Sequence, residues 1–568
     1  MSDRKQKVKE SVKAKAEKRK NTASLKTDVI LIILIALLAF SIRYVSLSDV
    51  GTTTDEPIYV IAALNYVDNI RHFDISSSTW AVNMEHPPVS KYIYGAAIWL
   101  AHGIDADLSY GMFLAAKTAS VLMGVLSCIV VYLIGRDFFN RKTGIAAAAV
   151  LALAPEFIAY TQVATLESPL ILLVSLTMYA FMWSLKKESR NYFIAAAILF
   201  GLVLGTKYNG LLILPVIGLM FLLYNTAKLR ARSGKLDVAT VIRNLRMFVP
   251  VASIIAFASL VVLVFFAIWP WLWSDPVGQL TQSLDHWAYQ IQEYFLGVKQ
   301  TPPLFYYPAY FLVTIPALLL IPLAVGIAES ARSKDVFKIG ILLWFIIPFA
   351  YNLSSLIMDG MRYVMIIYPA VALLCGYGLY RIGEIIYRWK GKINVTESQV
   401  FLGLTGITGV YLLITAALVS SYYLDYYNVI AGGPQNVQEH KLFKFSWWGE
   451  GIKESMDWVN DNAPSGSTIL MMTYPEDQAN TMYFTDGMRY IYPWLSKGGA
   501  NKEYNFTREP PLTFNGESRQ FSPDYVIINP AVTELLNITF NDSSYSVVYT
   551  SKIQGAPLVT VYKNMTTT

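Results

Sequence analysis

The chain has 568 residues, of which 54% are hydrophobic, 15% are charged and 14% are aromatic, and its mean hydropathy is +0.40. Soluble proteins carry charge on roughly a quarter of their residues, so this composition excludes an ordinary soluble enzyme and a disordered chain. Apolar runs of about 20 residues, the length of a membrane-spanning helix, recur as far as Ser420. Both cysteines, Cys128 and Cys375, lie inside such runs, which leaves no disulfide framework.

The first 27 residues form a basic segment. They hold ten Lys or Arg and three acidic residues, a net charge of +7, so the rest of the chain carries −1 of the total of +6. The segment lacks the apolar core and cleavage site of a secretory signal. We interpret residues 1–27 as a cytoplasmic tail near acidic lipids rather than a nucleic-acid-binding arm. Because Lys and Arg favour the cytoplasmic side, the first helix is expected to run outward.

Basic connections then alternate with poorly basic ones along the chain. The basic connections, expected in the cytoplasm, are 136–142, 186–190, 228–246, 332–338 and 381–392. The connections expected outside are 48–111, 161–168, 206–209, 270–304 and 352–362.

This alternation predicts about eleven transmembrane helices within residues 28–420 of a multi-pass cell-membrane protein. They are expected near 28–47, 112–134, 144–160, 169–185, 192–206, 210–226, 247–269, 305–326, 338–352, 363–380 and 399–420. The apolar segment 89–102 has only about 14 residues, too few to cross a bilayer. We interpret it as a helix lying in the outer interface.

Residues 421–568 are more polar and predict a small extracytoplasmic α/β domain. A helix is expected over 450–462, and strands over 468–472, 525–529, 546–549 and 558–562. Four glycosylation sequons with no central proline begin at Asn505, Asn537, Asn541 and Asn564. Their clustering predicts an exposed face in a compartment that glycosylates proteins.

The first external loop, 48–111, is long and carries eight acidic and two basic residues. Asp55 and Glu56 follow the first helix, and Glu85, His86 and Lys91 come later in the same loop. Prolines beside these residues stiffen the backbone and favour positioned side chains over mobile ones. Two carboxylates at a helix end are also common as solvated interface residues, so position alone leaves their role open.

Three further ionisable residues are expected at the same membrane face. They are Glu167 in Thr-Leu-Glu-Ser, Lys207 in Gly-Thr-Lys-Tyr-Asn-Gly, and Arg362 at the start of the tenth helix. Ionisable groups at membrane depth are functional candidates by default. Carboxylates and cations converging on one side of a helical bundle indicate transfer from a charged lipid at the outer face.

These segments resemble, in order, the signatures of the protein O-mannosyltransferase family, glycosyltransferase family 39. The motifs are Asp55-Glu56, the stretch 85–91, Thr165 to Ser168 and Gly205 to Gly210. The segments 269–276 and 427–460, with Trp447-Trp448-Gly449-Glu450-Gly451, resemble prokaryotic members. The resemblance implies a C-type glycosyltransferase fold, a superfamily that also contains the aminoarabinose transferases acting on lipid A. Glu167 stands where the family usually has Asp.

The resemblance implies transfer of a sugar, mannose in this family, from a polyprenyl or dolichyl monophosphate to a hydroxyl, with inversion. A phosphodiester leaves as an anion, so one carboxylate serves as base, unlike the pair in glycoside hydrolysis. Asp55 is the expected base, and Glu56 is expected to orient acceptor or sugar hydroxyls. His86, Lys91, Lys207 and Arg362 are candidates for holding the phosphate, and Glu85 and Glu167 for the wider donor site.

Three alternatives remain at this point. Asp55, Glu56, Glu85 and His86 have ligand types that suit a divalent metal, although their spacing matches no compact metal motif and no cofactor is firmly expected. The acceptor, expected to be protein Ser or Thr, could instead be a lipid or glycan. A transporter or flippase would place ionisable groups near helix midpoints in repeated halves, and neither feature is visible in the sequence. No nucleic-acid partner is expected.

Overall fold

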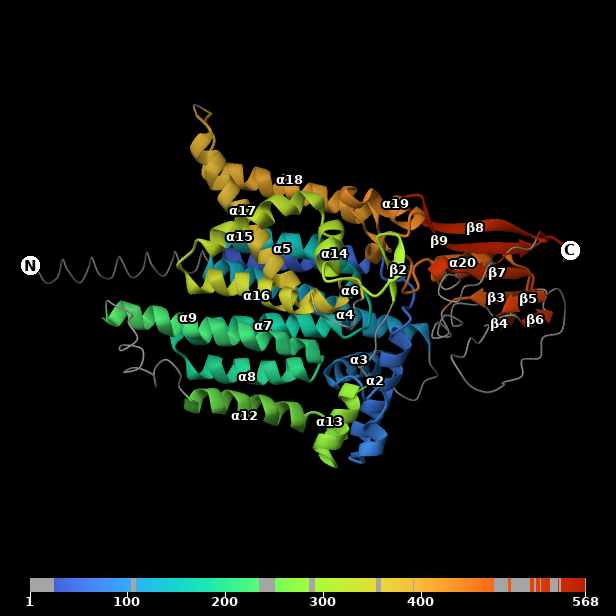
Figure 1. Cartoon of the computed structure of the whole chain (residues 1–568), viewed down its shortest axis with the longest axis horizontal. Helices are drawn as coiled ribbons and strands as arrows, with labels where there is room; N and C mark the ends of the chain where they lie inside the picture. The colour runs from blue at the N-terminus through green and yellow to red at the C-terminus, as the bar shows by residue number, and fades with distance from the viewer. Residues whose placement is uncertain are drawn as a thin grey trace, which may run out of the picture.

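The computed structural model describes residues 25–103, 109–233, 251–285, 292–353, 359–391 and 393–473. Beyond these it describes 489–491, 511–514, 517–520, 523–531, 540 and 543–566. Long helices lie side by side along the long axis of the molecule, and a small sheet lies at one end (Figure 1). The structure is therefore mostly helical, with strands near the C-terminus and a separate hairpin of β1 (Glu293–Phe295) and β2 (Val298–Gln300).

Among the residues that the structure describes, six helices are long and apolar enough to cross a membrane, or up to eight if each of two bent pairs counts as one span. The six are Leu25–Tyr44, Tyr110–Phe138 (α4), Glu167–Lys187 (α7), Tyr208–Arg232 (η2 with α9), Arg362–Trp389 (η5 with α17) and Glu397–Leu418 (α18). Three shorter apolar helices, α8 (Arg190–Leu204), α12 (Val251–Ala267) and α16 (Val336–Asn352), occupy further predicted spans. The count of eleven spans stays a prediction.

Two predicted spans are broken rather than continuous. The span expected at 144–160 consists of α5 (Arg141–Leu153) and α6 (Pro155–Gln162), which meet at 62°. The span expected at 305–326 consists of α14 (Tyr306–Thr314) and the helical segment Ala317–Ala331 (η4, Ala317–Leu319, with α15, Leu320–Ala331), which meet at 109°. Proline disfavours helical backbone in the residue before it, and Ala154 and Ile315, each followed by proline, are extended.

Glycines allow the inner helices of the bundle to touch. A Cβ added at Gly378 of α17 (Tyr368–Trp389) would overlap the carbonyl oxygen of Pro322 in α15. A Cβ at Gly326 of α15 would likewise overlap the carbonyl oxygen of Leu374 in α17. No side chain fits between backbones this close, so larger residues there would force α15 and α17 apart.

The described part of segment 48–111, which we predict to be external, contains two α-helices that lie at the sheet-facing end of the bundle (Figure 1). They are α2 (Glu56–Arg71) and α3 (Val89–His102), with the short η1 (Ser77–Trp80) between them. Pro57 lies in the first turn of α2, where its missing N–H has no helical partner to lose. Helix α3 has the predicted ends, and its place in the membrane interface stays a prediction.

The strands near the C-terminus form a five-stranded sheet in the order β4-β3-β7-β9-β8. Strands β3 (Thr468–Met472), β4 (Arg489–Ile491) and β7 (Tyr525–Ile528) are parallel, and β9 (Ala556–Asn564) pairs antiparallel with β7 and β8 (Tyr545–Ile553). Ile469 is opposite Tyr525, and Ile527 is opposite Val561. Helix α20 (Ile452–Asn462) packs on the sheet through Ile452, Met456 and Val459. A separate hairpin joins β5 (Pro511–Phe514) and β6 (Glu517–Gln520).

Residues just after Ser420 contact the membrane helices. The Asn428 side chain donates to the carbonyl oxygens of Leu312 and Ile315, both at 2.7 Å. Three of the four sequons lie outside the described residues. The fourth begins at Asn564, whose side chain is buried and hydrogen-bonded to Tyr545, so Asn564 is not on the exposed face that the clustering predicts.

Candidate active site

The predicted charged residues sit at the starts of helices. Asp55 directly precedes α2, Glu167 is the first residue of α7, Lys207 directly precedes η2 (Tyr208–Leu212), and Arg362 opens η5 (Arg362–Ile367). Helix starts that face the same end of a bundle bring side chains from distant parts of the sequence together. Four predicted site residues thereby meet although they span more than 300 positions of the chain.

Arg362 is the centre of this cluster. Its Nη2 lies 2.6 Å from Oδ2 of Asp55, and its Nε lies 3.0 Å from Oε1 of Glu167. Glu167 Oε1 also accepts a hydrogen bond of 2.7 Å from Lys207 Nζ. The side chain of Asp55 is 27% exposed, whereas those of Glu167, Lys207 and Arg362 are at most 9% exposed. Asp55 is therefore the member of this chain of ion pairs that a substrate can best reach.

The chain of charges continues through residues that the sequence did not single out. Asp359 Oδ2 lies 3.4 Å from Arg362 Nη1, and Asp359 Oδ1 accepts from Lys444 Nζ at 2.5 Å. Lys444 Nζ also lies 2.7 Å from Glu293 Oε1. Burial disfavours the ammonium form of Lys444, but the two carboxylates outweigh burial and raise its pKa. Lys444 thus stays charged between Asp359 and Glu293.

Two of these missed residues have a signal in the sequence. Asp359 precedes Arg362 by three positions, and Lys444 precedes the Trp447-Trp448 motif by three. Glu293 has no comparable marker. It reaches the cluster because β1 (Glu293–Phe295) lies beside Tyr306 of α14, whose hydroxyl donates to Glu293 Oε2 at 2.6 Å.

Trp448 links the region after the membrane helices to the cluster. Its ring lies 4.7 Å from the guanidinium carbon of Arg362, within cation–π range. Its carbonyl oxygen accepts from the Thr54 backbone N–H at 3.3 Å, next to Asp55. Segment 446–451 therefore packs on both Arg362 and the backbone that carries Asp55.

Glu56 has surroundings different from those of Asp55. Its side chain is fully buried, and its carboxylate accepts from the backbone N–H groups of Thr53 and Ala164, both at 2.7 Å. Lys117 Nζ lies 3.5 Å from Glu56 Oε2 and also donates to the carbonyl oxygen of Gly51. This burial favours a structural role for Glu56 over the predicted contact with substrate hydroxyls.

The side chain of Lys91, in the first turn of α3, reaches back to the loop that precedes this helix. Its ammonium group donates to the carbonyl oxygens of Asn83 and His86 and lies 4.9 Å from the centre of the Tyr66 ring. Burial lowers the pKa of Lys91 to about 7. The geometry therefore favours Lys91 as a residue that holds the loop 83–86 in place, rather than as a phosphate ligand.

Glu85 and His86 lie in this loop, and the carbonyl oxygen of His86 accepts from Lys91. His86 Nε2 is 3.2 Å from the hydroxyl of Tyr59, which is itself 3.4 Å from Arg362 Nη2. Burial lowers the pKa of His86 well below its usual value, and nearby cations lower it further, so the imidazole is neutral at pH 7. Glu85 accepts a hydrogen bond from Asn83. Of the predicted site residues, Asp55, Glu167, Lys207 and Arg362 form one network, and His86 joins it through Tyr59.

Within the part of the chain that the structure describes, no group of three or more His, Cys, Asp or Glu side chains is arranged to hold a metal ion. The residues that the sequence offered as alternative metal ligands, Asp55, Glu56, Glu85 and His86, are divided among different partners. Asp55 faces Arg362, and Glu56 faces Lys117. The residues present are therefore a poor fit to a divalent metal.

Part of the chain matches a known protein family. A family model described as dolichyl-phosphate-mannose-protein mannosyltransferase matches residues 85–272, about a third of the chain. The matched segment contains Glu85, His86, Lys91, Glu167 and Lys207. No curated protein matches the sequence.

The fold resembles that of one solved membrane protein, ArnT. The apo structure of ArnT from Cupriavidus metallidurans is 13% identical, and the match covers 95% of this chain and 98% of that chain with a TM-score of 0.50. The apo oligosaccharyltransferase of Archaeoglobus fulgidus is 12% identical and matches with a TM-score of 0.49, over 81% of this chain and 64% of that chain.

The chain is a mostly helical, multi-pass membrane protein whose fold resembles that of ArnT, and its residues 85–272 match the mannosyltransferase family model. The match includes the stretches 85–91, 165–168 and 205–210, which carry part of the predicted resemblance to protein O-mannosyltransferases.

Proposed function

We propose that the protein transfers mannose from a polyprenyl or dolichyl monophosphate to the hydroxyl of a protein Ser or Thr, with inversion at the anomeric carbon. The observation that carries the proposal is the pairing of the accessible carboxylate of Asp55 with Arg362, which shares Glu167 with Lys207. This arrangement sets a base beside two cations that can hold a phosphate. The description of the matched family supports mannose, the dolichyl carrier and a protein acceptor.

In this reaction Asp55 takes the proton of the acceptor hydroxyl as the hydroxyl oxygen attacks the anomeric carbon. The bond between that carbon and the phosphate oxygen breaks, and the polyprenyl phosphate leaves with both bonding electrons. Lys207 and Arg362 stabilise the negative charge that develops on the phosphate. Glu167 positions both cations, because one of its oxygens accepts from each of them.

The purified protein in detergent tests this proposal with radiolabelled dolichyl phosphate mannose and peptides that contain Ser or Thr. We expect labelled peptide, with the sugar in the inverted configuration. Label released only to water, or only to a lipid or glycan acceptor, would contradict the protein acceptor. A comparison with dolichyl phosphate glucose tests the sugar.

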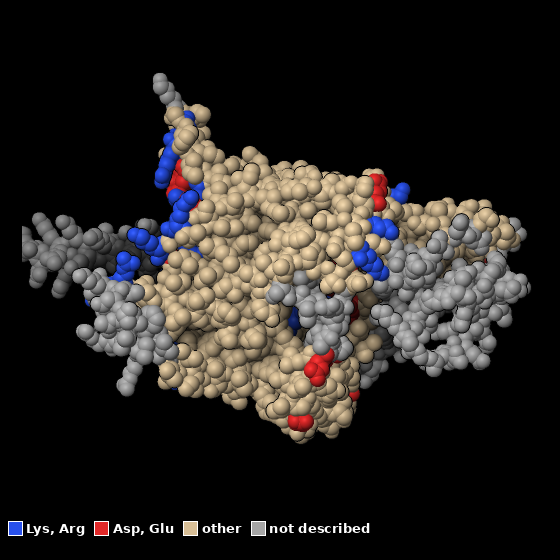
Figure 2. Space-filling model, in the orientation of Figure 1, with Lys and Arg blue, Asp and Glu red and all other residues tan. Residues whose placement is uncertain are grey.

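We further propose that the N-terminus is cytoplasmic and that residues after Ser420 are extracytoplasmic. Figure 2 shows lysines and arginines gathered at the end of the helical body away from the sheet, as expected of a cytoplasmic face. A cysteine at the exposed position Ser465 should react with an impermeant thiol reagent in intact cells, and one at the exposed Lys334 should not. The reverse pattern would contradict the orientation.

A further inference from the structure

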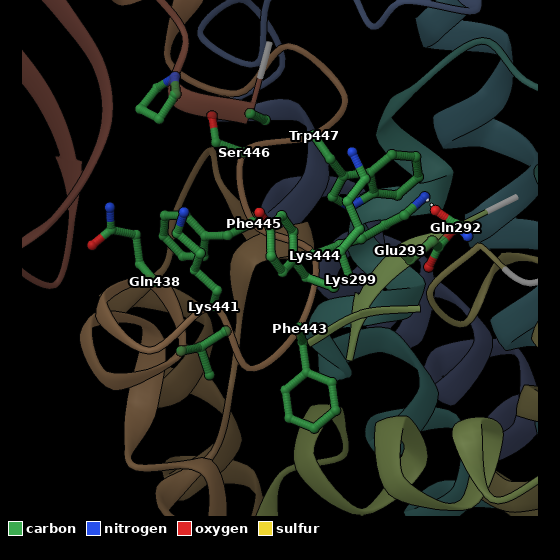
Figure 3. Close-up of a pocket in the computed structure, with 14 residues that line it drawn as sticks. Gln292, Glu293, Lys299, Gln438, Lys441, Phe443, Lys444, Phe445, Ser446 and Trp447 are labelled. Carbon is green, nitrogen blue, oxygen red and sulfur yellow. Dashed lines mark ion pairs between the residues drawn. The ribbon is translucent and has the colours of Figure 1, made fainter. Parts of the chain in front are cut away.

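The ion pair of Lys444 with Glu293 lines a pocket of about 270 Å³ beside the charged cluster (Figure 3). The pair is mostly buried, the side chain of Lys444 being 18% exposed and that of Glu293 1%. The Lys444 ammonium also lies 2.5 Å from Asp359 Oδ1 and 4.4 Å from the centre of the Trp447 ring. The proposed reaction gives Lys444 no role of its own.

The backbone of Lys444 is held on both sides. Its N–H donates to the hydroxyl of Tyr310 on α14 at 2.9 Å, and its carbonyl oxygen accepts from the hydroxyl of Tyr427. Both tyrosine side chains are buried. These contacts fix the point from which the Lys444 side chain reaches Asp359.

The three nitrogen atoms of Arg362 face carboxylates at different distances. Nη2 lies 2.6 Å from Asp55 and Nε 3.0 Å from Glu167, whereas Nη1 lies 3.4 Å from Asp359. Hydrogen bonds between charged groups are usually about 2.7–2.9 Å long, so Nη1 is the least firmly held nitrogen. Burial raises the pKa of Asp359, but Lys444 and Arg362 outweigh burial and keep it below its usual value, so Asp359 is a carboxylate. Asp359 lies nearer to Lys444 than to Arg362, which makes Lys444 its stronger partner.

We propose that Lys444 is a positioning residue of the donor site, which holds Asp359 back from Arg362 and leaves Nη1 of Arg362 for the donor phosphate. This role rests on the proposed binding of that phosphate by Arg362. Guanidinium N–H groups bind carboxylate and phosphate oxygens in the same geometry, so a carboxylate drawn fully onto Nη1 competes with the donor. Without Lys444, Arg362 is the remaining cation in contact with Asp359 among the described residues, and the carboxylate closes on Nη1.

The test measures the Kd for radiolabelled dolichyl monophosphate with the full-length protein in detergent. Lys444→Met removes the ammonium group, and we expect the Kd to rise about tenfold, the effect of one charge-assisted hydrogen bond. Turnover of dolichyl phosphate mannose at saturating donor, per folded molecule, should change much less, because Asp55 is unaltered. Lys299→Met, at an exposed lysine of the same pocket, is the matched control and should leave the Kd unchanged.

Asp359→Asn distinguishes positioning from a direct contact between Lys444 and the phosphate. The amide carries no charge that competes for Arg362, so this variant should bind the lipid at least as tightly as wild type. Adding Lys444→Met to Asp359→Asn should then leave the Kd within about twofold of that of Asp359→Asn. A direct contact would instead raise the Kd by the same factor in both backgrounds. This comparison also decides the matter if Lys444→Met alone does not fold, because the double variant leaves fewer buried carboxylates unpaired.

An unchanged Kd in folded Lys444→Met, or an equal rise in both backgrounds, would overturn the positioning role and leave the proposed function standing. A higher Kd in Asp359→Asn alone would also overturn it, because Asp359 would then support Arg362 rather than compete for it. Arg362→Gln should raise the Kd in the otherwise unaltered protein. An unchanged Kd in folded Arg362→Gln would overturn both the role of Lys444 and the donor site proposed around Arg362.

Discussion

Asp55 and Glu56 are neighbours in sequence, but they belong to two differently built charged regions. Asp55 is 27% exposed and lies at the open end of a chain of ion pairs through Arg362. Glu56 is sealed with Lys117, both side chains being 0% exposed, and its remaining bonds go to backbone N–H groups. The first region can exchange a partner for a substrate, whereas the second has no room for one.

Because their surroundings differ, Asp55 and Glu56 are expected to have different roles within one motif. A buried charge that loses its partner costs much more than a surface ion pair contributes. The Glu56 region is therefore expected to affect stability, and the Asp55 region to affect catalysis. Substitutions in the two regions test that division.

The largest effect is expected for Asp55→Asn. The amide keeps the shape of the carboxylate but cannot accept the proton of the acceptor, so turnover should fall by about 10² to 10⁴. Single-turnover transfer with saturating donor measures the chemical step, and donor binding should survive. Near-normal turnover would mean that another group, with Glu167 the next candidate, is the base.

Lys207→Gln should weaken donor binding. A charge-assisted hydrogen bond contributes about 1.5–3 kcal/mol, so the Kd for the donor should rise by roughly ten- to a hundredfold. Equilibrium binding of radiolabelled donor measures the change. Lys187→Gln, an exposed lysine at the far end of α7, is the matched control. Unchanged affinity in a folded Lys207 variant would remove this residue from the donor site.

The sequence motifs predict much of this site. Four residues can be identified as candidates from the sequence: Asp55, Glu167, Lys207 and Arg362. Each stands at the end of an apolar run, where an ionisable side chain is a functional candidate. The sheet is predicted by its β-type runs, and β3 has the predicted ends. Charges at the ends of apolar runs and β-type runs are short-range patterns, so they can be recognised in the sequence alone.

The other features of the site depend on contacts between residues that are far apart in the chain. The difference between Asp55 and Glu56 depends on Lys117 and Ala164, more than 60 positions away along the chain. Glu293 of β1 and Lys444, which precedes Trp447-Trp448, come together although their two segments share no sequence motif. The breaks near Pro155 and Pro316 escape prediction because the apolar run continues across each proline and hides the bend.

Glu56→Gln should reduce stability more than activity. The amide presents an NH₂ group where a carboxylate oxygen accepts a hydrogen bond, and Lys117 remains as a buried charge without its partner. The free energy of unfolding should fall by about 3–5 kcal/mol. Turnover per folded molecule should fall less than in Asp55→Asn. Thermal unfolding in detergent and active-site titration separate the two quantities.

A second substitution tests the buried pair of Glu56 and Lys117 further. Adding Lys117→Met to Glu56→Gln removes the unpartnered charge, so part of the lost stability should return. A double variant less stable than Glu56→Gln alone would show that Lys117 contributes mainly through its bond to Gly51. Activity close to zero in a stable double variant would place Glu56 in the catalytic region after all.

The smallest effect on turnover is expected at Lys91, where the readout is the pH dependence of stability. Burial lowers the pKa of this lysine in the folded protein from 10.5 to about 7. Between these two values the unfolded chain binds the proton and the folded chain does not, so stability rises with pH across this window. Below about pH 7 both states are protonated, and the cost of burying the charge is fully present.

Lys91→Met removes this titration, so wild type should gain thermal stability relative to the variant as the pH rises from about 7 to about 10. In Lys91→Arg the charge stays at every pH in the window, so this variant should show no such gain. A constant difference between wild type and Lys91→Met would mean that Lys91 stays protonated in the folded loop, and the charged lysine would then be available to the donor phosphate.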